Sequence, residues 1–157
     1  MKTNYKEIKI LLVLLLSQWF VNQVTAGGKI PLNVAAVSMN SKADKEANLK
    51  TFEFYIQQAA EANCHLIVFP EVALQQNPGF DAGFGAIYVP TTDEIVYVRE
   101  TAESISGHST EILMEWARKY HLFIVVGMTE KSSENDLYNT SVLIGPNGLP
   151  EKYRKRR

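Results

Sequence analysis

The sequence predicts an α/β fold with a largely parallel sheet, and two observations support this. Twice along the chain, an amphipathic helical pattern leads directly into a short apolar run, which indicates strand–helix–strand units with right-handed connections. The chain has 157 residues, 46% apolar and 21% charged, which is typical of a globular protein that can bury one core. We therefore expect a single α/β domain.

The first 26 residues resemble a secretory signal peptide. Lysines precede an apolar run at 10–16, and the small residues of "VTA" at 24–26 suit signal peptidase. An uncleaved anchor or a buried helix is the alternative, but a bilayer span needs about 20 apolar residues and polar residues interrupt this run between 17 and 23. We expect cleavage near Ala26, a domain over 27–157, and a secreted or periplasmic product without membrane attachment.

The charge distribution argues against nucleic acid as a partner. Without residues 1–26, which hold three lysines and one glutamate, the chain has 13 basic and 16 acidic residues, a net charge of −3. Without "EKYRKRR" at 151–157 as well, 8 basic and 15 acidic residues remain, a net charge of −7. Nucleic-acid-binding proteins spread positive charge over a face or along a helix, whereas here it is confined to the last residues.

The first unit lies between residues 30 and 71. The apolar run at 30–39 predicts a strand buried on both faces. From 43 to 64, apolar residues recur at steps of three and four, which predicts a helix with Asp44 as its N-cap. "HLIVFPE" at 65–71 predicts a second buried strand, which ends at Pro70 because proline cannot donate to a central ladder.

A long middle segment separates this unit from the next elements. Glycines, prolines and weak periodicity predict mostly loop from 72 to about 107, with a short strand at 95–98. Ser109 is the expected N-cap of a helix over 110–121, and "LFIVVGMTE" at 122–130 predicts another buried strand. Residues 137–155 predict a hairpin with its turn at Pro146-Asn147-Gly148.

Two charged residues stand where chemistry is expected. Glu71 follows a buried parallel strand, at the sheet edge where open α/β sheets bind ligands. Partial desolvation there would raise the pKa of its carboxyl toward the range useful for a general base. Lys155 follows the return strand of the hairpin, and an ammonium beside a reacting carbonyl stabilises the oxyanion. Taken singly, each is more typical of a solvated surface charge than of a catalytic residue.

The order of these features resembles the nitrilase, or carbon–nitrogen hydrolase, superfamily. The resemblance runs over 29–157 through "HLIVFPE", "GHSTEILMEWARKYHLFIVVGMTEK", "LYNTSVLIGPNG" and "KYRK". It implies an αββα sandwich and a Glu-Lys-Cys triad that hydrolyses amide C–N bonds, or nitriles, through a thioester or related acyl-enzyme. It also implies that Glu71 is the general base, that Lys155 is the oxyanion-stabilising lysine, and that no metal or organic cofactor takes part.

The chain departs from this pattern at its end. The family's nucleophilic cysteine follows the "YRK" lysine by some tens of residues, so the resemblance covers an amino-terminal half without nucleophile or second glutamate. We expect that half to be inactive alone, and prone to aggregate through an uncovered sheet face. The substrate is expected to be a small-molecule amide, with a nitrile less favoured, and a full-length protein could form homo-oligomers.

The remaining candidate residues have simpler interpretations. Cys64 cannot form an internal disulfide and is interpreted as a small buried apolar residue before a strand. His65 should point to the opposite face, so a Cys–His dyad is not expected. His108 and His121 flank a helix without metal-ligand spacing. Asn139-Thr140-Ser141 matches a glycosylation acceptor, yet it leads into a buried strand.

A second function class fits the basic end of the chain. A secreted α/β binding module that ends at Arg157 would use its basic tail for an acidic partner or surface. Salt-sensitive binding by a cooperatively folded monomer would support the module. A reading frame that continues past Arg157 to a cysteine would support the hydrolase.

Overall fold

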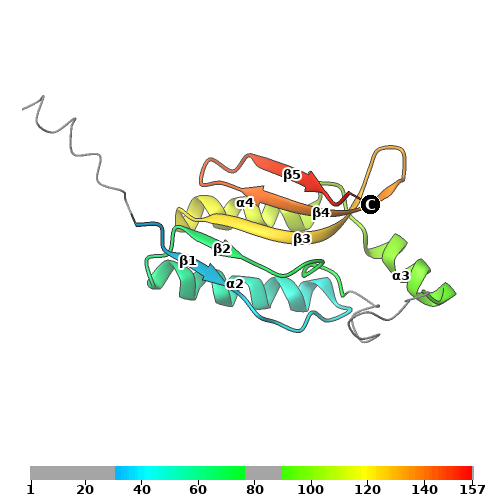
Figure 1. Cartoon of the computed structure of the whole chain (residues 1–157), viewed down its shortest axis with the longest axis horizontal. Coiled ribbons are helices and arrows are strands. Elements are labelled where there is room, and N and C mark those ends of the chain that lie inside the picture. The colour runs from blue at the N-terminus through cyan, green and yellow to red at the C-terminus, as the bar shows by residue number, and fades with distance from the viewer. Residues whose placement is uncertain (1–30, 77–89, 157) are drawn as a thin grey trace, which may run out of the picture. The chain divides into compact units, whose positions relative to one another are not determined.

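A mixed β-sheet forms the centre of the fold, which is known from a computed structural model that describes residues 31–76 and 90–156 (Figure 1). The described strands are arranged in the order β1-β2-β3-β4-β5. They are β1 (Val34–Ala36), β2 (Leu66–Val68), β3 (Phe123–Lys131), β4 (Leu137–Ile144) and β5 (Pro150–Arg154). The first three are parallel, and β3, β4 and β5 are antiparallel. The signal peptide predicted at 1–26 lies outside the described residues.

Two helices cover one face of this sheet. They are α2 (Lys45–Glu61) and α4 (His108–Tyr120), and both connect parallel strands, as the sequence predicts. Their apolar sides pack on the alternate strand residues that point toward them. This core contains, among others, Phe52, Ile56, Leu113, Ile67, Ile124, Val126, Met128, Val142 and Ile144, which are at most 1% exposed. One helix layer and one sheet layer make up half of an αββα sandwich.

The predicted N-cap of α2 and the predicted hairpin are confirmed, although α2 ends at Glu61, before the predicted end at 64. Asp44 is the N-cap of α2, and its side chain accepts hydrogen bonds from the backbone N–H groups of Glu46 and Ala47. The turn at 145–148 joins β4 to β5, and Gly148 there has a φ of 74°, a conformation that suits glycine.

The predicted strand at 95–98 is wrong, because these residues belong to α3 (Thr92–Thr101). Thr91 and Glu94 form a capping box, in which the Thr91 side chain accepts from the Glu94 N–H and the Glu94 side chain accepts from the Thr91 N–H. None of the α3 residues is buried, so local capping rather than an apolar stripe marks this helix. The β-branched residues of "EIVYV" misled the prediction.

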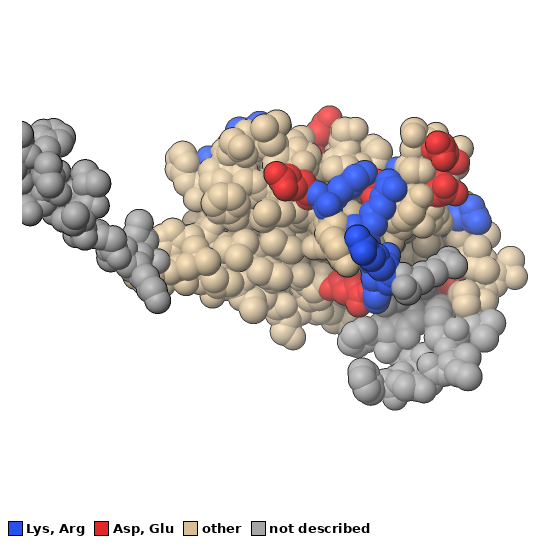
Figure 2. Space-filling model, turned by 45° about the horizontal axis from the view of Figure 1, so that its top comes forward, with Lys and Arg blue, Asp and Glu red and all other residues tan. Residues whose placement is uncertain are grey.

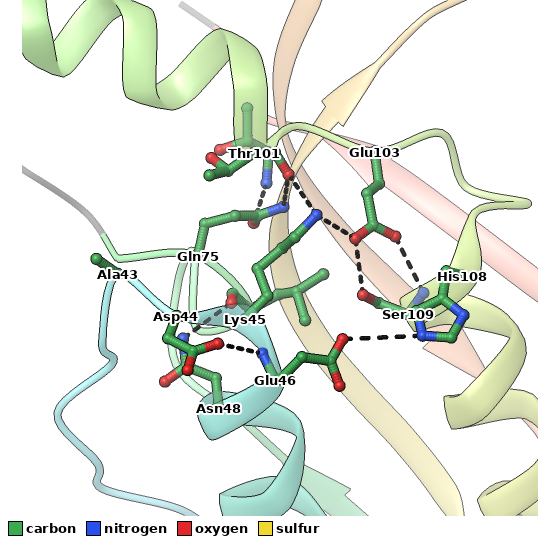
Figure 3. Close-up of polar contacts among 12 residues, drawn as sticks. Ala43, Asp44, Lys45, Glu46, Asn48, Gln75, Thr101, Glu103, His108 and Ser109 are labelled. Carbon is green, nitrogen blue, oxygen red and sulfur yellow. Dashed lines mark hydrogen bonds and ion pairs between the residues drawn. The ribbon is translucent and has the colours of Figure 1, made fainter.

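The expected role of Ser109 is also wrong, since Gly107 is the N-cap of α4. Glu103 takes over the capping function: its carboxylate accepts from the N–H of Ser109 at 3.0 Å and from its hydroxyl at 2.8 Å. Lys45 donates to the same carboxylate at 2.5 Å, which links α2 to α4 (Figure 3). Burial by itself would raise the pKa of Glu103, but these hydrogen bonds together lower it.

The first strand differs from the expectation of burial on both faces. β1 is only three residues long, and Val34 is 50% exposed. Among the described residues no helix covers the sheet face opposite α2 and α4, and Phe123, Leu143 and Tyr153 are exposed there too. Within the same residues, no helix is long and apolar enough to cross a membrane.

Neighbouring residues of β4 allow a test of this uncovered face. Leu143 is 39% exposed and Val142 is fully buried on the helix side. We expect Leu143→Thr to change the free energy of unfolding by no more than about 0.5 kcal/mol and to reduce aggregation of the 157-residue chain. The matched change Val142→Thr should cost about 1–3 kcal/mol because it buries a hydroxyl. Thermal unfolding and light scattering measure both, and equal costs would mean that Leu143 is covered.

Candidate active site

Glu71 stands in a tight turn directly after β2. β2 ends at Val68, two residues before the predicted end at Pro70, and Val72 has a φ of 51°, which is strained for a β-branched residue. The turn is held along β3: the Leu74 N–H donates to the Gly127 carbonyl, and the Thr129 N–H donates to the side chain of Gln75 at 2.9 Å. Neighbouring tertiary contacts therefore compensate for the strain.

Gly127 makes this close approach possible. A Cβ atom at position 127 would lie 2.5 Å from the Val72 nitrogen, 2.6 Å from the Pro70 oxygen and 2.8 Å from the Glu71 Cα. All three are backbone atoms, so they cannot move aside as the end of a side chain could. Only glycine allows the Glu71 turn to rest on the sheet at this position.

Lys155 and Asn139 reach Glu71 from the other side. The Lys155 Nζ and the Asn139 Nδ2 each donate to the Glu71 Oε1 at 2.6 Å, across 84 and 68 residues of sequence. Strand alternation places Asn139 and Lys155 on the sheet face opposite the helices, and the Lys155 N–H donates to the Asn139 carbonyl at 2.8 Å. The structure thus brings the two site residues predicted from the sequence together and adds Asn139, whose acceptor-like motif was not expected to carry a glycan.

A pocket of about 300 Å³ opens beside this group. Glu71, Asn139 and Lys155 line it together with apolar and small residues, including Val125, Gly127 and Tyr153. The Glu71 and Lys155 side chains are 53% and 64% exposed, so a molecule in the pocket can contact both. A second pocket of about 390 Å³ shares Asn139 and is lined by α3 residues such as Ile95 and Val98.

The pKa of Glu71 is lowered, which contradicts the expectation that desolvation raises it. The hydrogen bond from Lys155 is the largest cause, the hydrogen bond from Asn139 is next, and burial opposes them more weakly. The expectation failed because the side chain is half exposed and its partners come from distant strands. Glu71 is therefore an ionised acceptor at neutral pH.

Sequence reasoning missed a second carboxylate, Glu130 near the end of β3. Its side chain is 3% exposed and accepts hydrogen bonds from Arg154, Lys152 and Thr140. The hydrogen bonds from Arg154 are the largest cause that lowers its pKa to about 2, against the effect of burial. A glutamate at the end of a strongly apolar strand was the available signal, since a buried carboxylate requires a partner.

The basic run at the chain end thus divides between the two sheet faces. Lys152 and Arg154 pair with Glu130 on the helix side, and Lys155 pairs with Glu71 on the other. Figure 2 shows Lys and Arg side chains gathered near this end of the chain, with Asp and Glu side chains beside them. Three of the five basic residues in "EKYRKRR" therefore take part in ion pairs within the part of the chain that the structure describes.

The other candidates lie away from Glu71. Cys64 is half-buried between α2 and β2, at the opposite end of β2. His65 accepts a hydrogen bond from the Asn33 N–H, His108 begins α4 with its Nε2 3.8 Å from Glu46, and His121 is the C-cap of α4. Within the described residues, no group of three or more His, Cys, Asp or Glu is placed to hold a metal ion.

Comparisons with known proteins define the class. The carbon–nitrogen hydrolase family model matches residues 33–157, and the chain belongs to this family. A nitrilase of Pyrococcus abyssi is 34% identical over 126 residues, which are 79% of this chain and 43% of that protein. A human omega-amidase is 29% identical over 123 residues, which are 78% of this chain and 39% of that protein.

Solved structures agree on the fold. A CN-hydrolase superfamily protein of Xanthomonas campestris has a TM-score of 0.62 at 16% identity, over 80% of this chain and 41% of that chain. A nitrilase-superfamily member of Saccharomyces cerevisiae has a TM-score of 0.62 at 24% identity, over 80% and 44%. The chain therefore spans less than half the length of each of the relatives named here.

Gly127 gives the first prediction for the site. Gly127→Ala should cost about 1–3 kcal/mol of stability, because its Cβ would overlap backbone, and it should displace Glu71 from Lys155. The matched control is Gly145→Ala, whose Cβ would meet side-chain atoms of Phe123 and Asn147 at 3.0 and 3.1 Å. Chemical denaturation compares the two variants. Equal costs would remove the special role of Gly127.

The contact between Lys155 and Glu71 gives the second prediction for the site. Lys155→Met should raise the pKa of Glu71 toward its ordinary value of 4.5, measured by a carboxyl ¹³C NMR titration of the 157-residue chain. A lowered folded-state pKa stabilises the fold above the unfolded-state pKa, and this contribution is lost as pH falls through the folded-state value. The stability difference between wild type and Lys155→Met should therefore shrink below about pH 4. Lys131→Met, which removes an exposed lysine at the end of β3, should leave the Glu71 titration unchanged.

Proposed function

We propose that this chain forms part of an enzyme that hydrolyses the C–N bond of small-molecule amides. Glu71 is its general base, Lys155 stabilises the oxyanion, and a cysteine from the part of the family fold that this chain does not span is the nucleophile. The single observation that carries the proposal is the 2.6 Å contact between Glu71 and Lys155 beside a pocket.

The charge states suit these roles. The lowered pKa of Glu71 keeps its carboxylate ionised at neutral pH, so it is free to accept a proton. An ammonium group has three N–H donors, and among the described residues Lys155 uses one of them, on Glu71. The other two can point to a substrate oxygen. A carbonyl that draws Lys155 away from Glu71 also makes Glu71 more basic.

The steps of the reaction balance with these groups. Glu71 takes the proton of the cysteine thiol, and the thiolate adds to the amide carbon while Lys155 binds the oxyanion. The tetrahedral intermediate expels the amine, which takes the proton from Glu71 and leaves a thioester. Water then attacks the thioester with Glu71 again accepting a proton, and the carboxylic acid leaves as the cysteine thiol reforms.

Two relatives favour different substrate classes. The human relative is named an omega-amidase and the Pyrococcus abyssi relative a nitrilase. We assign amides as the first class and nitriles as the second, because omega-amidases recur among the relatives. Export to a secreted or periplasmic location, through cleavage near Ala26, is part of the proposal and rests on the signal-like residues 1–26.

The test uses a protein that joins these residues to the family's cysteine-bearing region. Ammonia release from a panel of small amides and nitriles gives kcat/KM. We expect Glu71→Gln and Lys155→Met each to lower it by about a hundred- to a thousandfold, the effect of losing a general base or an oxyanion donor. Lys131→Met is the matched control and should leave it unchanged.

Two results would contradict the proposed roles. Full turnover by Glu71→Gln or by Lys155→Met would remove the role assigned to that residue. The isolated 157-residue chain should release no ammonia, because Cys64 lies at the far end of β2 from Glu71. Turnover by that chain would require a different nucleophile.

A further inference from the structure

The position of Lys155 depends on β5, the strand that ends one residue before it. β5 is at the edge of the sheet and pairs only with β4 among the described residues. Its last ladder pair joins Thr140 and Arg154, one residue before Lys155. The Lys155 N–H still donates to the Asn139 carbonyl at 2.8 Å, but edge strands fray at their ends, so this end of β5 gains from a side-chain contact that holds it in place.

Glu130 is well placed to hold the end of this strand. Its backbone lies inside the sheet: β4 pairs with it through Tyr138 on one side, and the segment at Glu103 forms a parallel bridge with it on the other. The Lys131 N–H donates to the Glu103 carbonyl at 2.8 Å, which fixes this side further. The carboxylate thus projects from a part of β3 that is supported from both directions.

The carboxylate spans β4 to reach β5. Arg154 donates from Nε to the Glu130 Oε2 at 2.9 Å and from Nη2 to the Oε1 at 2.7 Å, and Lys152 donates to the Oε1 at 2.6 Å. Thr140 of β4 donates to the Oε2 at 2.9 Å. A bidentate arginine contact restricts orientation as well as distance. The Arg154 guanidinium also lies 3.6 Å from the centre of the Tyr138 ring.

Strand alternation carries this restraint across the sheet. Arg154 and Lys155 are consecutive, so when Arg154 is held on the helix face, Lys155 must point to the face where Glu71 lies. Without the Glu130 charge, Lys152 and Arg154 would repel each other on the same face of one strand. The end of β5 would then separate from β4 and take Lys155 with it.

We propose that Glu130 is a positioning residue that holds Lys155 against Glu71 by anchoring β5 from the opposite face of the sheet. The inference rests on the proposed function, in which the Glu71–Lys155 pair performs catalysis. Glu130 itself does not touch the pocket beside Glu71. It acts through Arg154 and the register of β5.

The titration of Glu71 in the 157-residue chain tests this, because it senses Lys155 whether or not the protein turns over. We expect Glu130→Gln to raise the pKa of Glu71 by at least half of the rise that Lys155→Met produces. Arg154→Gln should do the same, and it leaves Glu130 paired with Lys152, so it keeps the proposal testable if Glu130→Gln does not fold. The double variant should add nothing, since both changes break one contact.

Leu113→Ala is the control for general loosening. Leu113 is fully buried on α4, so the change lowers the melting temperature without contact to β5, and the pKa of Glu71 should stay at the wild-type value. An unchanged pKa of Glu71 in folded Glu130→Gln and Arg154→Gln overturns the proposal. A rise of equal size in Leu113→Ala overturns it too, because Glu130 would then have only a structural role.

Hydrolysis separates this inference from the proposed function. In the cysteine-bearing protein, Glu130→Gln should lower kcat by at least tenfold, and Glu130→Asp should recover part of the loss. If the pKa of Glu71 responds but no amide or nitrile is cleaved by the wild type, the proposed function fails and the positioning role remains. If the wild type is active and Glu130→Gln retains full kcat with an unchanged Glu71 titration, the positioning role alone fails.

Discussion

The contact between the Glu71 turn and Gly127 is the constraint on which the site depends. Backbone atoms of residues 70–72 occupy the space of a side chain at position 127, so the turn lies directly on the sheet. That placement sets the height of the Glu71 carboxylate above β3, and Lys155 and Asn139 meet it from strands farther along the same sheet. A larger residue at 127 would leave the charges in the sequence but separate them in space.

The two faces of the sheet have different roles: one carries the core and the other carries the candidate site. The face covered by the helices holds the apolar core and, near the end of β3, the ion pairs of Glu130 with Lys152 and Arg154. The other face holds Glu71 and Lys155, with a row of exposed apolar side chains beyond them. Alternation along β5 connects the two, because adjacent residues of a strand point to opposite faces. The basic run looks uniform in sequence, but its lysines and arginines therefore pair with two different glutamates on opposite faces of the sheet.

Prediction from sequence succeeded where the signal is local or belongs to a recognised motif. The stripe of α2 with its Asp44 cap and the turn at 146–148 depend on near neighbours, and the order of the motifs identified the family. It failed where the contact or the pKa of a residue depends on a partner that is distant in the sequence. Ser109 was expected to be the N-cap of α4, but the Glu103 carboxylate accepts from the N–H of Ser109 instead. Burial was expected to raise the pKa of Glu71, but the hydrogen bond from Lys155 lowers it. α3 was missed because capping, not periodicity, defines it.

The sequence by itself determined the class of fold, the family and the two residues proposed for catalysis, because helical periodicity, short apolar runs and motif order are all written along the chain. Only the tertiary structure decided that Glu71 contacts Asn139, that Glu130 collects Lys152 and Arg154, and that Gly127 admits the turn. These contacts join residues 22 to 68 positions apart or depend on how closely two backbones approach. Strand register sets such distances, and no single stretch of sequence encodes it.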